Sequence, residues 1–314
     1  NMGRLTYSYD ATPNFQAMPD AVIAPRNTNE VAEVLKVCNT HKIPVYVRGS
    51  GTNLCAGTCP LEGGIVLIFR HMNNILEIDE ENLTITVQAG VITLDIIKAV
   101  EEKGLFYPPD PSSMKISTIG GNINENSGGL RGLKYGVTRD YVMGLELVLP
   151  NGDMIRTGGK LAKDVAGYDL TRLFIGSEGT LGVITKAQIR IFDQPEERRF
   201  RGFLFQDMHG AFEASRELLQ KFKPSVMRLY DPAETASLIK KIVGVEKPGA
   251  FMNIAYEGLS KMVDLEEEIL LETFAKYGAE DLGSEYGEKW WKEKITFFYP
   301  GHMMDIPQMF GTMD

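Results

Sequence analysis

The spacing of hydrophobic positions predicts alternating helices and strands along the first part of the chain. Apolar residues recur at helical spacing over residues 28–41 and 93–104, and Thr28 is placed to cap the first of these helices. Short apolar runs indicate strands, at residues 44–48, 65–69, 83–89, 142–149 and 154–157. The last two runs flank an Asn151-Gly152 pair, which predicts a hairpin.

A second pattern begins after residue 195, behind the charged segment 194–199. Strand-like and helix-like segments alternate there, at residues 200–206, 209–222, 225–229, 231–243, 250–255 and 258–277. This alternation predicts a second α/β domain containing half or more of a ferredoxin-like arrangement. We therefore expect an α+β protein with two domains, residues 1–195 and residues 196–314.

Residues 107–139 interrupt the first pattern. The stretch is dense in Pro, Gly, Ser and Asn and shows little hydrophobic periodicity. A compact domain seldom keeps so long a structureless connection without a function, so we expect these residues to contact a ligand.

Composition narrows the classes of function. The formal net charge is -9, from 33 Lys and Arg against 42 Asp and Glu, which argues against nucleic-acid binding. No apolar run approaches the roughly 18 residues of a membrane span, and the first residues lack a signal-peptide pattern, so we expect a cytoplasmic protein without a transmembrane segment. Cys38, Cys55 and Cys59 fit a reducing compartment and are interpreted as packing residues. The four histidines lack paired spacing, and no metal site is predicted.

Three glycine-rich loops carry the candidate chemistry, within residues 48–53, 117–130 and 176–185. Glycine between strand-like runs lets backbone N–H groups approach a bulky anion. The first loop, RGSGTN, follows a strand as a dinucleotide loop does, but it lacks the third glycine of GxGxxG and no helical pattern follows it. The chain also has no GK[ST] motif. The loops therefore predict a large phosphate-bearing ligand and disfavour a nicotinamide-type Rossmann site.

Together the loops resemble the FAD-binding domain of the vanillyl-alcohol-oxidase (PCMH-type) flavoproteins. The resemblance covers residues 15–192 and is carried by PVYVRGSGTNLCAGT, YPPDPSSMKISTIGGNINENSGGLRGLKYGVTRDYV and GSEGTLGVIT. Among these flavoproteins, the chain is similar to the branch of glycolate oxidase D subunits and D-lactate dehydrogenases. The resemblance implies a two-lobed FAD-binding domain followed by a ferredoxin-like cap domain that binds substrate.

The same resemblance implies which residues contact FAD. These are Arg48, Gly49, Ser50, Gly51, Thr52, Asn53, Pro111, Ser112, Thr118, Gly121, Asn122, Asn126, Ser127, Glu178, Gly179, Gly182 and Ile184. For the asparagines, turn formation is the alternative, because Asn tolerates left-handed backbone. Family members that attach FAD covalently through the first loop have a histidine where this chain has Thr52, so the FAD is expected to be non-covalent.

For this branch, the implied reaction is oxidation of a 2-hydroxy acid of the D-lactate or glycolate type. A general base takes the hydroxyl proton while the α-hydrogen leaves as hydride to flavin N5. Residues 223–235, 277–291 and 299–314 resemble instead the alkylglycerone-phosphate-synthase branch, whose members exchange an acyl for an alkyl group without net redox. On that resemblance Arg228 is the candidate catalytic residue, and an arginine paired with Asp231 is the alternative. His302 and Arg131 are weaker candidates, interpreted as structural.

A third hypothesis is a non-catalytic or incomplete flavin-binding subunit. The HxGDGNxH-type motif of the hydroxy-acid branch is absent from the chain, so we expect a truncated C-terminal region of the FAD-linked oxidase type. The expected partners are a small anionic hydroxy-acid or phosphate-bearing substrate and an electron-accepting protein subunit. A homodimer is also compatible with the resemblance.

Overall fold

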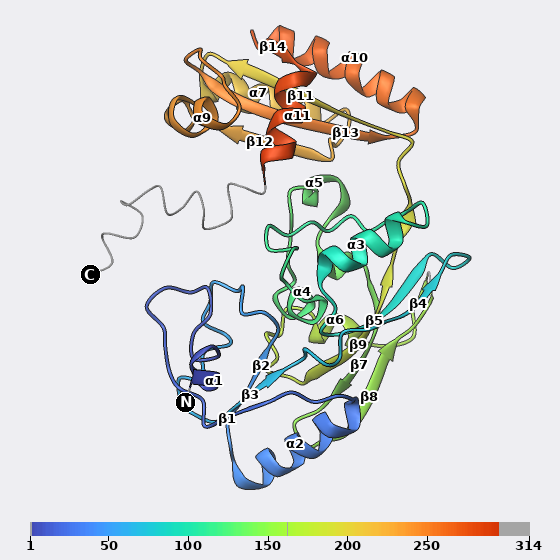
Figure 1. Ribbon diagram of the computed structural model, residues 1–314. Coiled ribbons are helices and arrows are strands. Elements are labelled where there is room, and N and C mark those ends of the chain that lie inside the picture. Colours follow the sequence, from blue (N-terminus) through green and yellow to red (C-terminus); the bar gives the residue numbers. More distant parts are fainter. Residues whose placement is uncertain (1, 162, 295–314) are drawn as a thin grey trace. The chain divides into compact units, whose positions relative to one another are not determined.

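The chain folds into two compact units, seen in a computed structural model that describes residues 2–161 and 163–294 (Figure 1). The first unit contains the residues up to 128 and residues 137–194. The second contains residues 129–136 and the residues from 195 onward. The short segment 129–136 therefore packs within the second unit although the first unit surrounds it in the sequence.

A small parallel sheet opens the first unit. Its strands lie in the order β1 (Ala21–Ile23), β3 (Ile65–Ile68), β2 (Val45–Arg48). Helix α2 (Thr28–His41) connects β1 to β2, as parallel strands require. The expected cap at Thr28 was wrong by one residue. Asn27, a preferred N-cap residue, accepts from the backbone N–H of Glu30, and the Thr28 hydroxyl donates to Glu146 at 2.8 Å.

The larger sheet of the first unit is antiparallel throughout, in the order β4-β5-β9-β7-β8. Its strands are β4 (Ile75–Asp79), β5 (Thr84–Gln88), β7 (Val142–Val148), β8 (Met154–Gly158) and β9 (Val183–Arg190). The predicted hairpin is confirmed, since β7 and β8 pair around a turn in which Gly152 has φ +87°. The remaining elements are α1 (Met2–Leu5), α3 (Thr93–Glu101), α6 (Leu170–Phe174) and the paired strands β6 (Leu105–Phe106) and β10 (Phe192–Asp193).

The stretch 107–139 contains helical turns that its sequence did not predict. They are α4 (Ile119–Glu125), α5 (Gly132–Tyr135) and the 3-10 turn η1 (Thr138–Asp140). Glycines and asparagines within α4 hide its periodicity. Thr118 nevertheless caps this helix by accepting from the N–H of Gly121.

The second unit is built on a four-stranded antiparallel sheet in the order β12-β13-β11-β14. Its strands are β11 (Glu197–Phe205), β12 (Val226–Tyr230), β13 (Ala250–Gly258) and β14 (Glu280–Gly283). Its helices are α7 (Met208–Leu219), the continuous turns α8 (Pro232–Glu234), η2 (Thr235–Ile239) and α9 (Lys240–Ile242), then α10 (Ser260–Lys276) and α11 (Ser284–Glu293). Numbered along the unit, the strand order is 2-3-1-4, which is the ferredoxin-like arrangement expected from the sequence.

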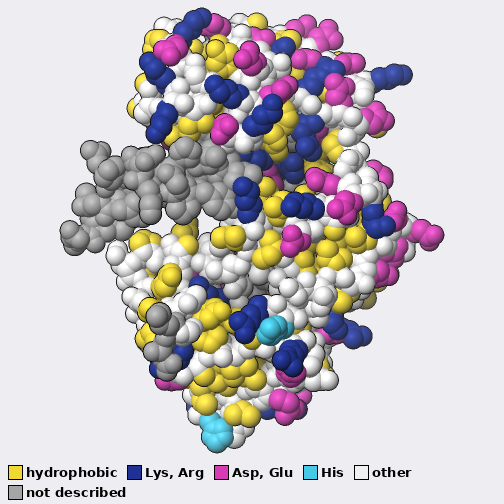
Figure 2. Space-filling view, in the orientation of Figure 1, with side chains coloured by type: hydrophobic (Ala, Val, Ile, Leu, Met, Phe, Trp, Pro, Cys, Tyr) yellow, Lys and Arg dark blue, Asp and Glu magenta, His cyan; other side chains and the backbone are white. Residues whose placement is uncertain are grey.

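Both faces of this sheet are covered. On one face, Phe203, Met252 and Tyr256 pack with α7 and α10. On the other, Leu204, Phe251 and Trp290 form a second apolar cluster, against which Leu130 of the segment 129–136 packs. Acidic and basic side chains are mixed over the visible face of the second unit (Figure 2). Among the described residues, no helix is both long enough and apolar enough to span a membrane.

Candidate functional site

The glycine-rich segments meet around a cavity of about 260 Å³ in the first unit. Residues 49–54 follow β2, and residues 117–127 include α4. Glu178 precedes β9, and Ile184 lies within it. Segments far apart in the sequence thus line a single cavity, as the repeated glycines suggested.

The loop after β2 offers an unusual row of hydrogen-bond donors. Within the described part of the chain, the backbone N–H groups of Ser50, Gly51, Thr52 and Asn53 donate to no acceptor. The carbonyl of Gly51 instead accepts from the Ala11 N–H at 3.0 Å. Successive unpaired amides in a concave backbone form an anion-binding nest, and in this cavity they are available to a phosphate group.

Glycine is required at two positions of this loop. Gly51 has φ +71°, and a Cβ there would collide with the guanidinium of Arg48. A Cβ on Gly49 would collide with the hydroxyl of Thr118 on the opposite wall. A side chain at Gly49 would fill the space between the loop and Thr118, and one at Gly51 would displace Arg48 and strain the loop backbone.

Arg48 lies beneath the loop and is only 6 % exposed. Its Nη1 donates to the carbonyl of Tyr9 at 2.6 Å and to the hydroxyl of Thr58 at 3.3 Å. Burial lowers the pKa of Arg48, and the nearby Asp10 carboxylate opposes that shift. A positive charge therefore lies directly behind the row of amides.

Asparagine side chains hold the second wall. Asn122 Nδ2 donates to the hydroxyl of Thr93 at 2.6 Å. Asn124 joins two glycine segments, because its Oδ1 accepts from the N–H of Gly179 and its Nδ2 donates to the carbonyl of Gly120, both at 3.0 Å. Asn124 was missed from the sequence, although it lies in the same motif as Asn122. The repeated asparagines at positions 122, 124 and 126 are the signal that could have found it.

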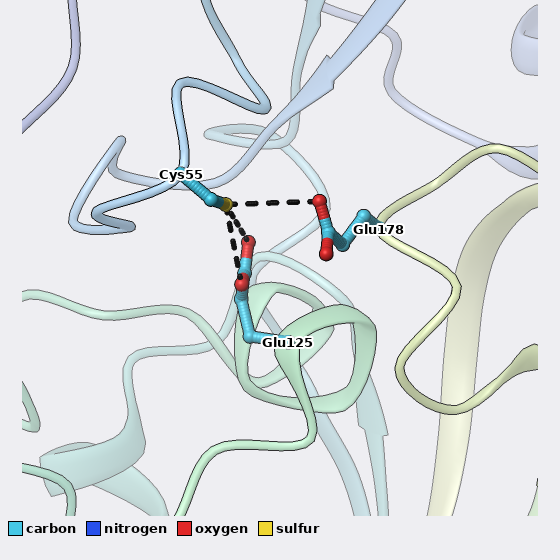
Figure 3. A group of neighbouring side chains, drawn as sticks. All are labelled: Cys55, Glu125 and Glu178. Atoms are coloured by element: carbon cyan, nitrogen blue, oxygen red, sulfur yellow. Dashed lines mark hydrogen bonds between the residues drawn. The ribbon is translucent and has the colours of Figure 1, made fainter. Parts of the chain in front are cut away.

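A thiol lies beside two carboxylates that line the cavity (Figure 3). Cys55 Sγ lies 3.6 Å from a carboxylate oxygen of Glu178 and 3.7 Å from one of Glu125. Burial, and then the charge of Glu178, raises the pKa of Glu125. Burial chiefly raises the pKa of Cys55, so the thiol stays protonated and donates to the carboxylates. A metal ion would find one sulfur and two oxygen ligands here, but the hydrogen-bonded thiol already accounts for the arrangement.

Comparison with known proteins identifies the domain that contains the cavity. Residues 19–158 match the FAD binding domain family model. These residues form an FAD-binding domain. They include the free amides of residues 50–53 and the α4 wall, and both suit the diphosphate of FAD.

The relatives of this FAD-binding domain are hydroxy-acid oxidoreductases by name. The chain is 67 % identical over 232 residues to the glycolate oxidase subunit GlcD of Bacillus subtilis, a match that covers 74 % of the chain and 49 % of the relative. It is 41 % identical over 229 residues to a D-lactate dehydrogenase of Archaeoglobus fulgidus, covering 72 % of the chain and 51 % of the relative. The chain thus spans about half the length of these curated relatives.

A solved structure matches nearly the whole chain. Alkyldihydroxyacetonephosphate synthase superimposes with a TM-score of 0.81 at 25 % identity, covering 94 % of the chain and 59 % of that protein. The structure of p-cresol methylhydroxylase, at 21 % identity and a TM-score of 0.75, shows the fold alone. Both structures support the PCMH-type arrangement.

Most of the predicted cofactor residues line the cavity of the FAD-binding domain. Those that do are Gly49, Ser50, Gly51, Thr52, Asn53, Thr118, Gly121, Asn122, Ser127, Glu178 and Ile184. Those outside its lining are Arg48, Pro111, Ser112, Asn126, Gly179 and Gly182. Asn126 takes a left-handed φ of +49° and ends α4, which is the turn-forming role. Lining residues that the sequence did not single out include Leu54, Thr58, Phe69, Ala89, Ser113, Ser117, Gly120, Asn124 and Glu125.

Arg228, the candidate catalytic residue, lies on β12 of the second unit. It is exposed, and its guanidinium lies 5.3 Å from the centre of the Tyr230 ring. Asp231, its expected partner in the alternative interpretation, instead caps α8 by accepting from the N–H of Glu234. Opposite it on β13, Asn253 is fully buried, and its side-chain amide has no hydrogen-bond partner within residues 2–161 and 163–294.

The two weaker candidates are Arg131 and His302. Arg131 is 8 % exposed and lies against Trp291, with 5.2 Å between its guanidinium carbon and the ring centre. His302 lies outside the described residues.

Proposed function

We propose that this chain is part of an FAD-dependent oxidoreductase that oxidises a 2-hydroxy acid of the D-lactate or glycolate type. The 67 % identity to a glycolate oxidase subunit, over 74 % of the chain, carries this proposal. The D-lactate dehydrogenase relative supports the same substrate class. Because the chain spans about half of each relative, the activity belongs to the protein of which this chain is a part.

The residues of the first unit would hold the cofactor. The free amides of residues 50–53 would bind the diphosphate, with the Arg48 charge behind them. Glu178 and Ile184 line the same cavity and would contact another part of the cofactor. Bound FAD supplies the hydride acceptor, at flavin N5, for oxidation of the hydroxy acid.

The cofactor would be held without a covalent bond. Thr52 stands in the first loop where covalent members of the resembled family carry histidine, and a threonine hydroxyl does not form that bond. The Cys55 thiol lies beside Glu125 and Glu178, which line the cavity, and its raised pKa keeps it out of the nucleophilic thiolate form. FAD should therefore be released when the protein is unfolded.

Arg228 would act on the substrate. An exposed guanidinium matches the planar carboxylate of a hydroxy acid and can bind it through two hydrogen bonds. Tyr230 holds the guanidinium by its ring, and its own pKa is raised by burial, so it stays a neutral hydroxyl. This role makes Arg228 a substrate-orienting residue.

An electron-accepting protein would reoxidise the cofactor in this proposal, since the relatives include an oxidase subunit. The thiols of Cys38, Cys55 and Cys59 are free, which fits a reducing compartment such as the cytoplasm.

A second function is favoured by one observation. Alkyldihydroxyacetonephosphate synthase superimposes on 94 % of the chain, second unit included. A flavin-dependent transferase with a phosphate-bearing substrate is therefore the alternative. Arg228 would then bind the phosphate group in place of a carboxylate.

The two functions are separated by an anaerobic visible spectrum of the FAD-loaded protein. Addition of D-lactate or glycolate should bleach the oxidised flavin band, while L-lactate serves as the matched stereochemical control for D-lactate. Bleaching by a ketose-phosphate ester alone would support the transferase. If FAD binds and neither substrate class changes the spectrum, both proposed functions are wrong for the protein tested.

A further inference from the structure

We propose that Asp10 is a positioning residue for the phosphate-binding loop, acting through Thr58 and through the backbone beside it. This inference rests on the proposed role of residues 50–53 in holding the FAD diphosphate. Asp10 lies before the range 19–158 that matches the FAD-binding family model, and it does not line the cavity.

Asp10 is nearly buried, at 8 % exposure, and accepts three hydrogen bonds. Its Oδ1 accepts from the Thr12 N–H at 2.9 Å. Its Oδ2 accepts from the Thr58 N–H at 3.3 Å and from the Thr58 hydroxyl at 3.0 Å. Burial alone would raise the pKa of Asp10, but these bonds outweigh it and the pKa falls below its ordinary value. The carboxylate is therefore charged and fixed in place.

The Thr58 hydroxyl transmits this arrangement to the loop. Since it donates to Asp10, its lone pairs face two other donors, Arg48 Nη1 and Asn53 Nδ2, each at 3.3 Å. Asn53 is the last residue of the row of free amides. Its Oδ1 in turn accepts from the N–H groups of Cys55 and Gly57, both at 3.2 Å. One carboxylate thus orders the charge behind the loop and the side chain at its end.

The residues next to Asp10 fix the backbone of the same loop. The Ala11 N–H donates to the carbonyl of Gly51 at 3.0 Å, and the Thr12 hydroxyl accepts from the Ala56 N–H at 2.7 Å. With its carbonyl held by Ala11, the peptide after Gly51 keeps its N–H, that of Thr52, available to the cavity. Asp10 fixes the position of these two residues, Ala11 and Thr12, by accepting from the Thr12 N–H.

Charge and position predict opposite effects for one substitution. Asp10→Asn removes a negative charge close to a dianionic diphosphate. The loss of this Coulomb repulsion alone would tighten FAD binding. The amide would, however, turn its NH₂ toward Thr58, whose N–H and hydroxyl would lose their acceptor. If position dominates, FAD binding weakens instead.

The test measures the dissociation constant of FAD by flavin fluorescence, together with the thermal midpoint of each apoprotein. Asp10→Asn and Thr58→Val should weaken FAD binding about tenfold or more, the effect of losing one charge-assisted hydrogen bond. Thr58→Ser keeps the hydroxyl and should bind FAD as the wild type does. Asp20→Asn is the matched control, because Asp20 also accepts from a backbone N–H, that of Gly64 at 2.7 Å, outside the loop. It should leave the FAD dissociation constant unchanged.

Several outcomes would overturn the inference. Tighter or equal FAD binding by Asp10→Asn means that its charge, and not its position, matters. Affinity that simply follows the thermal midpoint through all four variants, Asp20→Asn included, means that Asp10 is only structural. Gly51→Val tests the underlying assignment separately. If that variant retains FAD, the loop does not hold the cofactor, whereas lost FAD there with unchanged binding by Asp10→Asn rejects the positioning role alone.

Discussion

Replacing Glu146 by Gln should weaken the first unit in a pH-dependent way. Glu146 lies on β7 with its side chain 11 % exposed, and its carboxylate joins separate elements. Lys186 of β9 and Arg156 of β8 approach its two oxygens at 2.9 Å each. The hydroxyl of Thr28, the first residue of α2, donates to it at 2.8 Å. One side chain thus ties the helix of the small sheet to the large sheet.

The size of the effect follows from the pKa. Burial alone would raise the pKa of Glu146, but hydrogen bonds from Lys186, Thr28 and Arg156 lower it from 4.5 to about 2. At about 1.4 kcal/mol per pKa unit, this shift corresponds to at most about 3 kcal/mol of unfolding free energy. Because the folded-state pKa is the lower one, this stabilisation is complete above about pH 4.5 and disappears as the pH falls toward 2.

The assay is urea unfolding of the wild type and Glu146→Gln, followed by far-ultraviolet circular dichroism from pH 7 down to pH 3. The difference in unfolding free energy should be about 2 to 3 kcal/mol at pH 7 and should shrink below pH 4.5. A difference below about 0.5 kcal/mol, or one that does not change with pH, would refute the reasoning.

Two controls accompany this measurement. Glu33→Gln removes the exposed pair with Lys36 on α2 and should cost less than about 0.5 kcal/mol. The two tryptophans, Trp290 and Trp291, both belong to the second unit, so their fluorescence transition should be the same in Glu146→Gln as in the wild type.

Three further changes test the cofactor loop, the second sheet and the substrate-orienting arginine. Gly179→Val should abolish FAD retention, measured by flavin fluorescence after gel filtration, because Gly179 has φ +77° and a Cβ there would lie 3.1 Å from that of Val47; full occupancy would contradict it. Asn253→Leu should raise the unfolding free energy by about 1 to 2 kcal/mol, because it removes a buried amide without partners; a loss of stability by tryptophan fluorescence would mean that the amide has a structural role. Arg228→Ala should leave the FAD dissociation constant unchanged and raise the hydroxy-acid concentration for half-reduction about tenfold or more; lost FAD would make Arg228 structural.

Local sequence patterns were enough to predict the regular elements. The 3.6-residue spacing of Val31, Leu35 and Cys38 marks α2, whose buried face contains all three. The Asn151-Gly152 pair marks the β7–β8 hairpin for the equally local reason that Gly152 needs a left-handed backbone. In the second unit, the alternation of helices and strands indicated the ferredoxin-like class, while the strand order depends on pairings between strands that are not consecutive, such as β11 with β14.

The unpredicted features depend on contacts between distant residues. The Thr28 hydroxyl, expected to cap α2, instead donates to Glu146 far along the chain. Helix α4 contains Gly120, whose position is fixed by close packing against Ala89 rather than by helical propensity. Strand β14 has an exposed, polar beginning and is ordered by pairing with β11. Each of these outcomes needs the tertiary structure before it can be seen.

The candidate site divides in the same way. The glycine motifs indicated the loop of free amides, since backbone access is written in the sequence as missing side chains. The residues that hold the loop from outside, Asp10 and Thr58, have no such signature. Their importance comes from a hydrogen bond that spans almost fifty positions.

The placement of residues 129–136 has a consequence for how the protein folds. Leu130 completes an apolar cluster with Leu204 and Phe251, and the intervening chain must first be built into the other unit. Closing so long a loop costs entropy before its contacts are made, and folding slows as contacts become less local. During synthesis, the strands of the ferredoxin-like sheet would pair with one another first. Residues 129–136, which precede the sheet in the sequence, would pack against it afterwards. We expect the packing of residues 129–136 against this sheet to be the slow phase of refolding. The phase should be absent when refolding starts from a state in which these residues are already packed.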